Sequence, residues 1–391
     1  MRFVGIDIAS ETHVVAVVAE DQSVLLKPVS FKEDAAGYEL LWKKLGSSTN
    51  TLVTMEATGH YWQNLFAALV TRSFAVALIN PLRSRRFAQE DLERTKTDAI
   101  DALGLARFGA QKRPRVTALR DAATDELREL VRLRDRLMQD FGDCTRRLHR
   151  LVDLGFPEFK RYVKRLDSQL STGLLKEYPN ARAFQGASAG QVARYRYDGR
   201  HRVGDALAKE LIEAAQISVG AHHGPAYQMQ VRYLCEDLGV LRKRLGDIDR
   251  DIAEQLSAHE VGTLLTTIDG IGPTTAARLI AELGNPADFA TAAALAAYVG
   301  VIPGLKQSGK RQGKRANLSP IGHARLRRAL WMPTLVAVQK NPWVRAYYER
   351  LRANGKPAKV ALVASMRKLL IAVHVVARTR KPFVPLLEGT P

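Results

Sequence analysis

Four carboxylates in the N-terminal part of the chain are the residues best suited to chemistry: Asp7, Glu56, Asp98 and Asp101. Asp7 stands in the middle of the apolar run GIDIAS, where a charged side chain is costly unless it has a partner. Glu56 directly follows the apolar run TLVTM, and Asp98 and Asp101 are three residues apart in KTDAIDA. On a helix that pair would share one face, where two like charges repel each other unless a cation is present.

The joint placement of these carboxylates predicts a metal site. Such groups can converge on two hard cations about 3.5–4 Å apart, as two-metal phosphoryl transfer requires. An all-oxygen ligand set suits Mg²⁺ or Mn²⁺, and no His/Cys cluster in the sequence suggests zinc. Each residue also has a plainer interpretation: Asp7 as an edge or capping residue, Glu56 as a surface loop residue, and the pair as a solvated helix face.

A second candidate for chemistry is Ser308, which precedes Gly309 in a basic segment. Its basic neighbours, which we expect to bind nucleic acid, are Lys306, Lys310, Arg311, Lys314 and Arg315. A serine that attacks a phosphodiester needs an accessible hydroxyl, cations that stabilise the phosphorane charge, and a base or metal that takes its proton. The segment supplies the first two, although a serine in such a loop can also simply bind phosphate.

The segment TIDGIGPTTAARLIAELGN, residues 267–285, has the form of a helix-hairpin-helix. Gly270 and Gly272 would allow close backbone approach, and the N–H groups at the start of the next helix could meet a phosphate. An ordinary glycine turn between packed helices is the alternative. Downstream, Ser319 before Pro320 predicts a helix N-cap, and we expect nucleic-acid contacts from that helix as well, through Arg325, Arg327 and Arg328.

The carboxylates need a scaffold, and the hydrophobic pattern predicts one of the ribonuclease H type. Short apolar strands at 2–9, 13–19, 23–30, 51–55 and 74–79 are interspersed with helices at 34–45, 60–71 and about 95–110. This order predicts an α/β domain over residues 1–115, with a mixed five-stranded sheet and helices on both faces. Asp7 would lie at the centre of the first strand and Glu56 at the end of the fourth.

Two heptad patterns predict a coiled-coil hairpin from residues 116–152 and 228–260. Residues 153–227 would form a helical insertion at its tip, to which the pattern assigns no task. Cys144 falls on the heptad seam and is expected in the core. Residues 261–391 are expected to be mainly helical, with helices at 273–284, 291–299, 320–339, 342–353 and 356–378.

The charge distribution favours a polyanionic partner. The 391 residues carry a net charge of +19, of which residues 301–360 contribute fourteen Lys/Arg and a single acid. A concentrated basic field binds nucleic acid through phosphate contacts and counterion release. The two cysteines indicate a reducing compartment, no signal peptide is evident, and the apolar stretch Val360 to Ala377 is interrupted by charges. We therefore expect a cytoplasmic, nucleoid-associated protein without a membrane span.

Taken together, these motifs resemble the DEDD transposases of bacterial insertion sequences, which are bridge-RNA-guided recombinases. The resemblance covers about residues 1–150 and 228–378 and leaves 153–226 without an anchoring motif. It rests on GIDIAS, MEATG, INPLRSRRFAQ, KTDAIDA, DGIGPTTA, GVIPGLKQSGK and SPIGHARLRRAL.

The resemblance implies a RuvC-like N-terminal domain whose acidic residues correspond one by one to Asp7, Glu56, Asp98 and Asp101. It implies a C-terminal transposase domain with Ser308 as nucleophile, a 5′-phosphoserine-type intermediate, and Mg²⁺ in the carboxylate site. It also implies a dimer to tetramer with composite active sites from different protomers, and an element-encoded RNA that pairs with donor and target double-stranded DNA. The sequence departs slightly, with Gln307 before the serine where relatives can carry a second serine.

Two other functions remain open from the sequence. A junction-resolvase-like nuclease would use the carboxylates and a metal-activated water, with Ser308 only contacting phosphate. A non-catalytic nucleic-acid-binding scaffold would use only the basic loop. The carboxylate quartet disfavours the scaffold, and the serine loop favours the recombinase.

Overall fold

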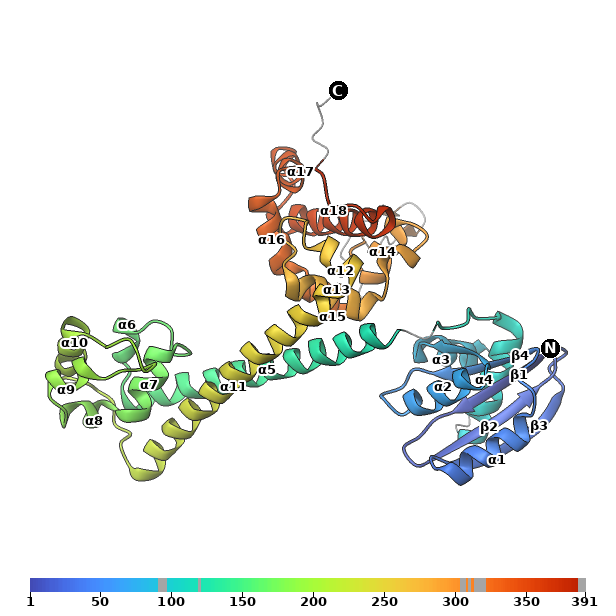
Figure 1. Cartoon of the computed structure of the whole chain (residues 1–391), viewed down its shortest axis with the longest axis horizontal. Helices are drawn as coiled ribbons and strands as arrows, with labels where there is room; N and C mark the ends of the chain where they lie inside the picture. The colour runs from blue at the N-terminus through green and yellow to red at the C-terminus, as the bar shows by residue number, and fades with distance from the viewer. Residues whose placement is uncertain (91–96, 119–120, 303–306, 309–310, 313–320, 386–391) are drawn as a thin grey trace. The chain divides into compact units, whose positions relative to one another are not determined.

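A mixed five-stranded sheet forms the N-terminal unit, Met1–Arg120, and a larger helical unit spans Asp121–Pro391 (Figure 1). The computed structural model describes residues 1–90, 97–118, 121–302, 307–308, 311–312 and 321–385. The strands are β1 (Arg2–Asp7), β2 (Thr12–Val18), β3 (Val24–Lys32), β4 (Thr51–Glu56) and β5 (Ala75–Ile79), in the order β3-β2-β1-β4-β5. β1, β2 and β3 pair antiparallel, whereas β1–β4 and β4–β5 are parallel. The predicted mixed sheet is confirmed.

Helices cover both faces of this sheet. α1 (Ala35–Leu45) and α2 (Trp62–Thr71) bury Leu41 and Leu65 with Val4, Ile6 and other residues of one sheet face. On the opposite face α4 (Asp98–Lys112) packs closely on β1 and β2, because Gly5 of β1 has no side chain to hold the helix away. α3 (Pro81–Glu90), which the sequence pattern did not predict, inserts Phe87 against α4.

The second unit is built on two long antiparallel helices, α5 (Ala122–Gly155) and α11 (Pro225–Ser257), which pack along each other. The heptad spacing of the sequence places Ala123 on the seam between these helices, but Ala123 is exposed, and Thr124 and Val131 are buried instead. The same spacing is interrupted by one polar residue, Arg134, which forms an ion pair with Asp249 of α11 at 2.5 Å. A polar residue on the seam is thereby satisfied by the opposite helix.

A helical module lies between α5 and α11 in the sequence. It comprises α6 (Phe159–Tyr162), α7 (Gln169–Glu177), α8 (Ala181–Gln185), α9 (Ala189–Arg194) and α10 (Asp205–Gln216). Its own core includes the mutually packed rings of Phe156, Phe159 and Phe184, with apolar residues of α5 and α11. The hairpin and the module therefore share one hydrophobic cluster.

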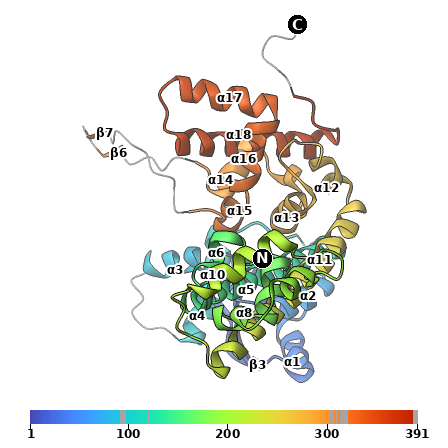
Figure 2. The same ribbon diagram turned by 90° about the vertical axis from the view of Figure 1, so that its left-hand side faces the viewer.

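The C-terminal helices form a second cluster with the other end of the hairpin. They are α12 (Glu260–Leu265), α13 (Pro273–Leu283), the short 3₁₀ helix η1 (Pro286–Asp288), α14 (Ala292–Val299), α15 (Ala324–Ala329), α16 (Trp331–Lys340), α17 (Pro342–Ala353) and α18 (Ala358–Thr379). α17 lies along α18 (Figure 2). α18 is long and apolar enough to cross a membrane, but 61% of its most apolar stretch of 18 residues is buried inside the protein. It is the central core helix of this cluster.

The expected single helix at 320–339 is wrong. The structure has two helices, α15 and α16, which meet at Leu330. Pro333 in the first turn of α16 lacks an N–H and cannot continue a helix that enters from α15. α15 is capped by His323, whose Nδ1 accepts from the Leu326 N–H, whereas the predicted cap Ser319 lies outside the described residues.

Candidate active site

Asp7 and Glu56 are the last residues of two adjacent parallel strands. Ile6 pairs with Met55 in the β1–β4 register, so the two carboxylates follow immediately, at the same edge of the sheet. The expectation that Asp7 lies at the centre of its strand is corrected here, since β1 ends on it. The carboxyl edge of parallel strands is where open α/β sheets place ligand-binding groups.

α4 brings the other two carboxylates toward this edge. Thr97 caps the helix by accepting a hydrogen bond from the Ile100 N–H, so Asp98 is the first helical residue and Asp101 lies one turn later. The next residue, Ala102, lies directly on β1: a Cβ built on Gly5 would be 2.0 Å from its carbonyl oxygen. This close approach requires glycine at position 5 and holds the start of α4 near the end of β1.

The pKa of Asp7 shows that the other three carboxylates lie within electrostatic range of it. Burial, and then the negative charges of Asp101, Asp98 and Glu56, raise the pKa of Asp7 from 3.8 to about 6. Repulsion of this kind is what a bound cation relieves. Functional sites are where such perturbed carboxylates gather.

Glu56 is held by two hydroxyl groups that the sequence interpretation missed. Ser84 of α3 donates to one carboxylate oxygen, and Thr58 donates to the other at 3.2 Å. Ser84 lies in INPLRSRRFAQ, one of the segments that carry the family resemblance, so that resemblance was the available signal. Hydrogen bonds of this kind orient carboxylates that bind metal.

A buried histidine fixes the segment that follows Asp7. The side chain of His13 is fully buried, and its Nδ1 accepts from the Ala9 N–H at 3.3 Å. Its Nε2 therefore carries the proton and donates to Glu33 at 2.6 Å. Although burial opposes it, hydrogen bonds from His13, Tyr38 and Asn64 lower the pKa of Glu33.

The donor set fits a hard divalent cation, since all four groups are carboxylates. Among the residues that the structure describes, however, no three His, Cys, Asp or Glu side chains are close enough together to hold a metal ion. The four carboxylates thus lie within electrostatic range of one another without forming a closed coordination shell.

The structure describes little of the serine loop. Gln307–Ser308 (β6) pairs antiparallel with Arg311–Gln312 (β7), so that Ser308 is opposite Arg311. Lys306, Lys310, Lys314 and Arg315 lie outside the described residues. Residues 309–310, which follow Ser308 in the sequence, also lie outside the described residues.

The arginines after the loop have different surroundings. Arg325 is half exposed and pairs with Glu282 at 3.2 Å, and Arg327 donates to the carbonyls of Val299 and Gly300 at 3.4 Å. Arg328 is exposed and has no ion pair with any described residue. Arg325 and Arg327 therefore have structural contacts, and Arg328 is the one of the three left open to a ligand.

Glu282 of α13 is a buried hub that the sequence interpretation did not identify. Its side chain is 2% exposed and pairs with Arg132 of α5, His323 and Arg325. Burial alone would raise its pKa, but hydrogen bonds from His323 and Arg132 hold the pKa well below its usual range. The hub ties α5, α13 and the start of α15 together.

The two glycines of the predicted helix-hairpin-helix differ in role. Gly270 has a φ of +103°, and a Cβ there would be 2.7 Å from Ala337 Cβ of α16. Gly272 caps α13, with Pro273 as its first residue, and faces open space. Gly270 is thus needed for helix packing, and phosphate contact by the Gly272 end remains a prediction.

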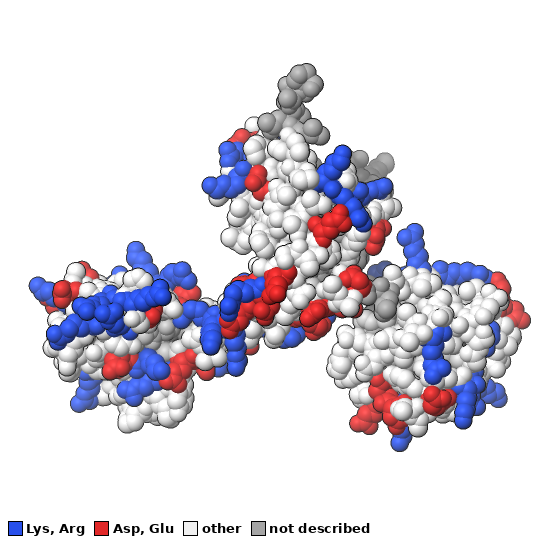
Figure 3. Space-filling model, in the orientation of Figure 1, with Lys and Arg blue, Asp and Glu red and all other residues white. Residues whose placement is uncertain are grey.

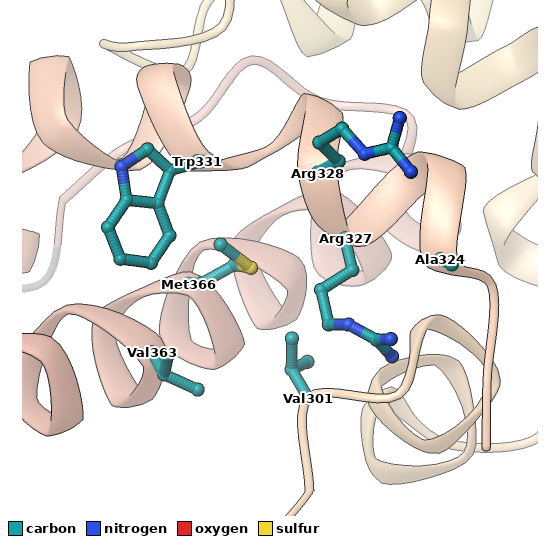
Figure 4. A pocket seen from close by; sticks show the side chains of 7 residues that line it. All are labelled: Val301, Ala324, Arg327, Arg328, Trp331, Val363 and Met366. Atoms are coloured by element: carbon teal, nitrogen blue, oxygen red, sulfur yellow. The ribbon is translucent and has the colours of Figure 1, made fainter. Parts of the chain in front are cut away.

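A cavity of about 370 Å³ lies beside α15. Val301, Val363, Met366 and Trp331 give it an apolar side, and Arg327 and Arg328 a cationic side (Figure 4). Val301 and Ala324 on its wall flank the serine loop in the sequence. The cavity is therefore bounded by the segments that carry this loop.

Family models match both parts of the chain, the mixed sheet with its carboxylate edge and the C-terminal helices, and they identify a transposase of the DEDD type. A transposase family model of this type matches residues 4–157, and a model described as "Transposase IS116/IS110/IS902 family" matches 262–349. The chain belongs to this IS110-type transposase family.

Curated relatives match along most of the chain. A pilin gene-inverting protein of Moraxella bovis is 27% identical, over 97% of each chain. A mini-circle putative transposase for IS117 of Streptomyces coelicolor is 28% identical, over 99% of this chain and 98% of the relative. The IS110 43.6 kDa protein of the same species is 28% identical, over 78% and 76% of the two chains.

Proposed function

We propose that this transposase of bacterial insertion sequences cuts and exchanges DNA strands with Ser308 as nucleophile and Mg²⁺ (or Mn²⁺) at the four carboxylates. The observation that carries the metal half of the proposal is the raised pKa of Asp7, because three further carboxylates act on one half-buried group. The serine half rests on the family resemblance and on the basic residues around Ser308.

The proposed step conserves the energy of the phosphodiester. The Oγ atom of Ser308 bonds to phosphorus, the P–O3′ bond breaks, and the DNA 5′-phosphate remains on the serine. The serine proton passes to a base at the site, and the departing 3′ oxygen takes up a proton. Attack by another strand's 3′-hydroxyl reverses these changes and joins the new strands, so no external energy source is needed.

Asp7, Glu56, Asp98 and Asp101 would hold the cation. Bound Mg²⁺ supplies charge stabilisation at the phosphoryl oxygens. Ser84 and Thr58 orient Glu56, and His13 fixes the backbone after Asp7. The carboxylates and the serine belong to different units of the chain, and the resemblance implies that they act together from different protomers.

Partners beyond DNA are part of the proposal. A structured RNA of the element would pair with donor and target DNA, and the basic segment 301–360 would contact the phosphates of these nucleic acids. The active assembly would be a dimer to tetramer in the cytoplasm, on the nucleoid. Sequencing the RNA that co-purifies with the protein tests the guide.

The second candidate is a RuvC-like nuclease that activates water. It is favoured by one observation: the four carboxylates and the groups that orient Glu56 all belong to the N-terminal unit.

The two functions differ in the covalent intermediate. We expect Ser308→Ala to abolish covalent protein–DNA adducts on a supercoiled donor–target pair with RNA and Mg²⁺, whereas Ser257→Ala, at an exposed serine of α11, keeps them. Undiminished strand cleavage by Ser308→Ala would refute the serine mechanism and support the nuclease. Asp7→Asn should lose metal-dependent cleavage and still bind RNA.

A further inference from the structure

The helical module between α5 and α11 carries a basic hairpin that the activity described so far does not use. Residues 194–202 read RYRYDGRHR, with four arginines, two tyrosines and one acid. We call this segment the arginine hairpin. Lys and Arg side chains also form a broad band on the face of this module shown in Figure 3.

Backbone hydrogen bonds give the arginine hairpin a defined shape. Arg196 and Arg202 form an antiparallel bridge, and the N–H groups of Tyr197 and Val203 donate to His201 and Tyr195 at 3.3 and 3.2 Å. At the turn, Gly199 has a φ of +80°. The turn is thus built by the chain itself and needs no ligand to form.

The single acid of the arginine hairpin, Asp198, does not neutralise its arginines. The Asp198 carboxylate accepts from the backbone N–H groups of Arg200 and His201 at 2.9 and 2.7 Å, and pairs with the His201 ring at 2.7 Å. Its oxygens are therefore committed to the turn. Among the described residues, Arg194, Arg200 and Arg202 have no acidic partner.

The alternation of residue types orients the hairpin. Arg196 is exposed, whereas Tyr195 and Tyr197 on either side of it are half-buried. Arg194, the last residue of α9, is exposed as well. Tyr197 packs on α7, where a Cβ on Gly173 would be only 3.0 Å from the Tyr197 Cβ. Successive residues of an extended segment point to opposite sides, so Tyr195 and Tyr197 anchor the arginine hairpin and Arg196 faces solvent.

We propose that the arginine hairpin is a nucleic-acid-binding site that grips the phosphate backbone. Arg196 and Arg202 are cross-strand partners and so point to the same side, and the exposed Arg200 lies between them in the sequence. Neighbouring guanidinium groups of this kind can bind neighbouring phosphates, which arginine contacts with bidentate geometry. No base-specific geometry is evident among these side chains, so the expected binding is independent of sequence. The proposed binding requires neither the carboxylates nor Ser308.

The test compares two charge-neutralised variants of the full chain. Arg200→Gln/Arg202→Gln removes two charges from the hairpin, and Lys43→Gln/Lys44→Gln removes two from exposed positions of α1 in the other unit. Binding to labelled DNA and RNA duplexes of one arbitrary sequence is followed by fluorescence anisotropy over a range of salt, with EDTA present. EDTA removes metal-dependent chemistry, so failure here is distinguishable from failure of the proposed catalytic mechanism.

Loss of two phosphate contacts lowers the slope of log K against log salt by about 2. We expect this change, with affinity reduced about tenfold, for Arg200→Gln/Arg202→Gln and not for the α1 control. Arg200→Lys/Arg202→Lys should recover most of the slope, because charge is retained. If affinity falls for only one type of duplex, that nucleic acid is the ligand. If it falls for both, the arginine hairpin binds the phosphate backbone of DNA and RNA alike. If the hairpin variant behaves as the α1 control on both duplexes, the proposal is overturned.

Discussion

Gly5 of β1 and Ala102 of α4 approach so closely that a Cβ on Gly5 would lie 2.0 Å from the Ala102 carbonyl oxygen. The contact falls two residues before Asp7 and one residue after Asp101, on the two elements that carry these carboxylates. The spacing of the carboxylates is therefore set by backbone packing as well as by their own side chains.

Gly5→Ala should separate α4 from β1. Overpacking of this kind costs about 1–3 kcal/mol, and the added atom meets backbone, which cannot rotate away. Gly104→Ala in α4 is the matched control, because a Cβ there meets nothing within 4 Å. Replacing glycine by alanine in a helix interior should stabilise the protein by about 0.5–1 kcal/mol. Urea unfolding checks both, and equal stability of the two variants would contradict the packing argument.

Asp7→Asn should stabilise the metal-free protein at pH 8. Well below the unfolded pKa of 3.8, both the folded and the unfolded chain bind the Asp7 proton, so no penalty exists there. As pH rises through the folded pKa of about 6, the folded chain must release the proton against partial burial and three like charges. After allowance for partial solvent screening, we expect a gain of about 1–2 kcal/mol at pH 8 that disappears by about pH 3.

The same variant tests metal binding without an activity assay. Mg²⁺ that binds only the folded protein should raise the free energy of unfolding of the wild type by about 2.7 kcal/mol at a hundredfold excess over Kd. A higher unfolding temperature reports this gain. Asp7→Asn should lose this response at pH 8. An equal rise in both proteins would place the Mg²⁺ elsewhere.

Ser84→Ala should weaken the site through Glu56. The variant removes one hydrogen-bond donor to the carboxylate, and such losses typically lower metal affinity or activity about 10–100-fold. Because Ser84 positions another residue, higher Mg²⁺ concentration should partly restore activity. Ser84→Thr keeps the hydroxyl and serves as the control. A Mg²⁺ dependence unchanged in Ser84→Ala would show that Thr58 alone suffices.

Glu282→Gln should destabilise the helical unit. The substitution leaves Arg132 and His323 beside a neutral group. Breaking a buried ion pair lowers the free energy of unfolding by about 3–5 kcal/mol. The loss is smaller here because a third partner, Arg325, is half exposed. The low pKa of Glu282 means that its stabilisation is present above its unfolded pKa and is lost as pH falls toward the folded value. Glu129→Gln, at an exposed residue of α5, is the control. Thermal unfolding at pH 7 and pH 4 should show a smaller difference at the lower pH.

The regular elements of the N-terminal unit could be predicted, because burial imposes a period on the sequence. β1 to β5 follow apolar runs, and α1, α2 and α4 follow the helical period. α3 was missed because PLRSRRFAQE is mostly polar and lacks an apolar stripe, yet it supplies Ser84 to Glu56. The break at Leu330 was missed because the apolar pattern continues through it.

The sequence alone determined the types of the candidate catalytic groups: four carboxylates, a serine next to a glycine, and a concentrated basic segment. Only the tertiary structure decided that Asp7 and Glu56 end adjacent strands, and that Gly5 admits α4 beside them. It alone joined Glu282 to Arg132 and His323, residues 150 and 41 positions away. Local periodicity reports whether a residue is buried, whereas its partners depend on how distant elements pack.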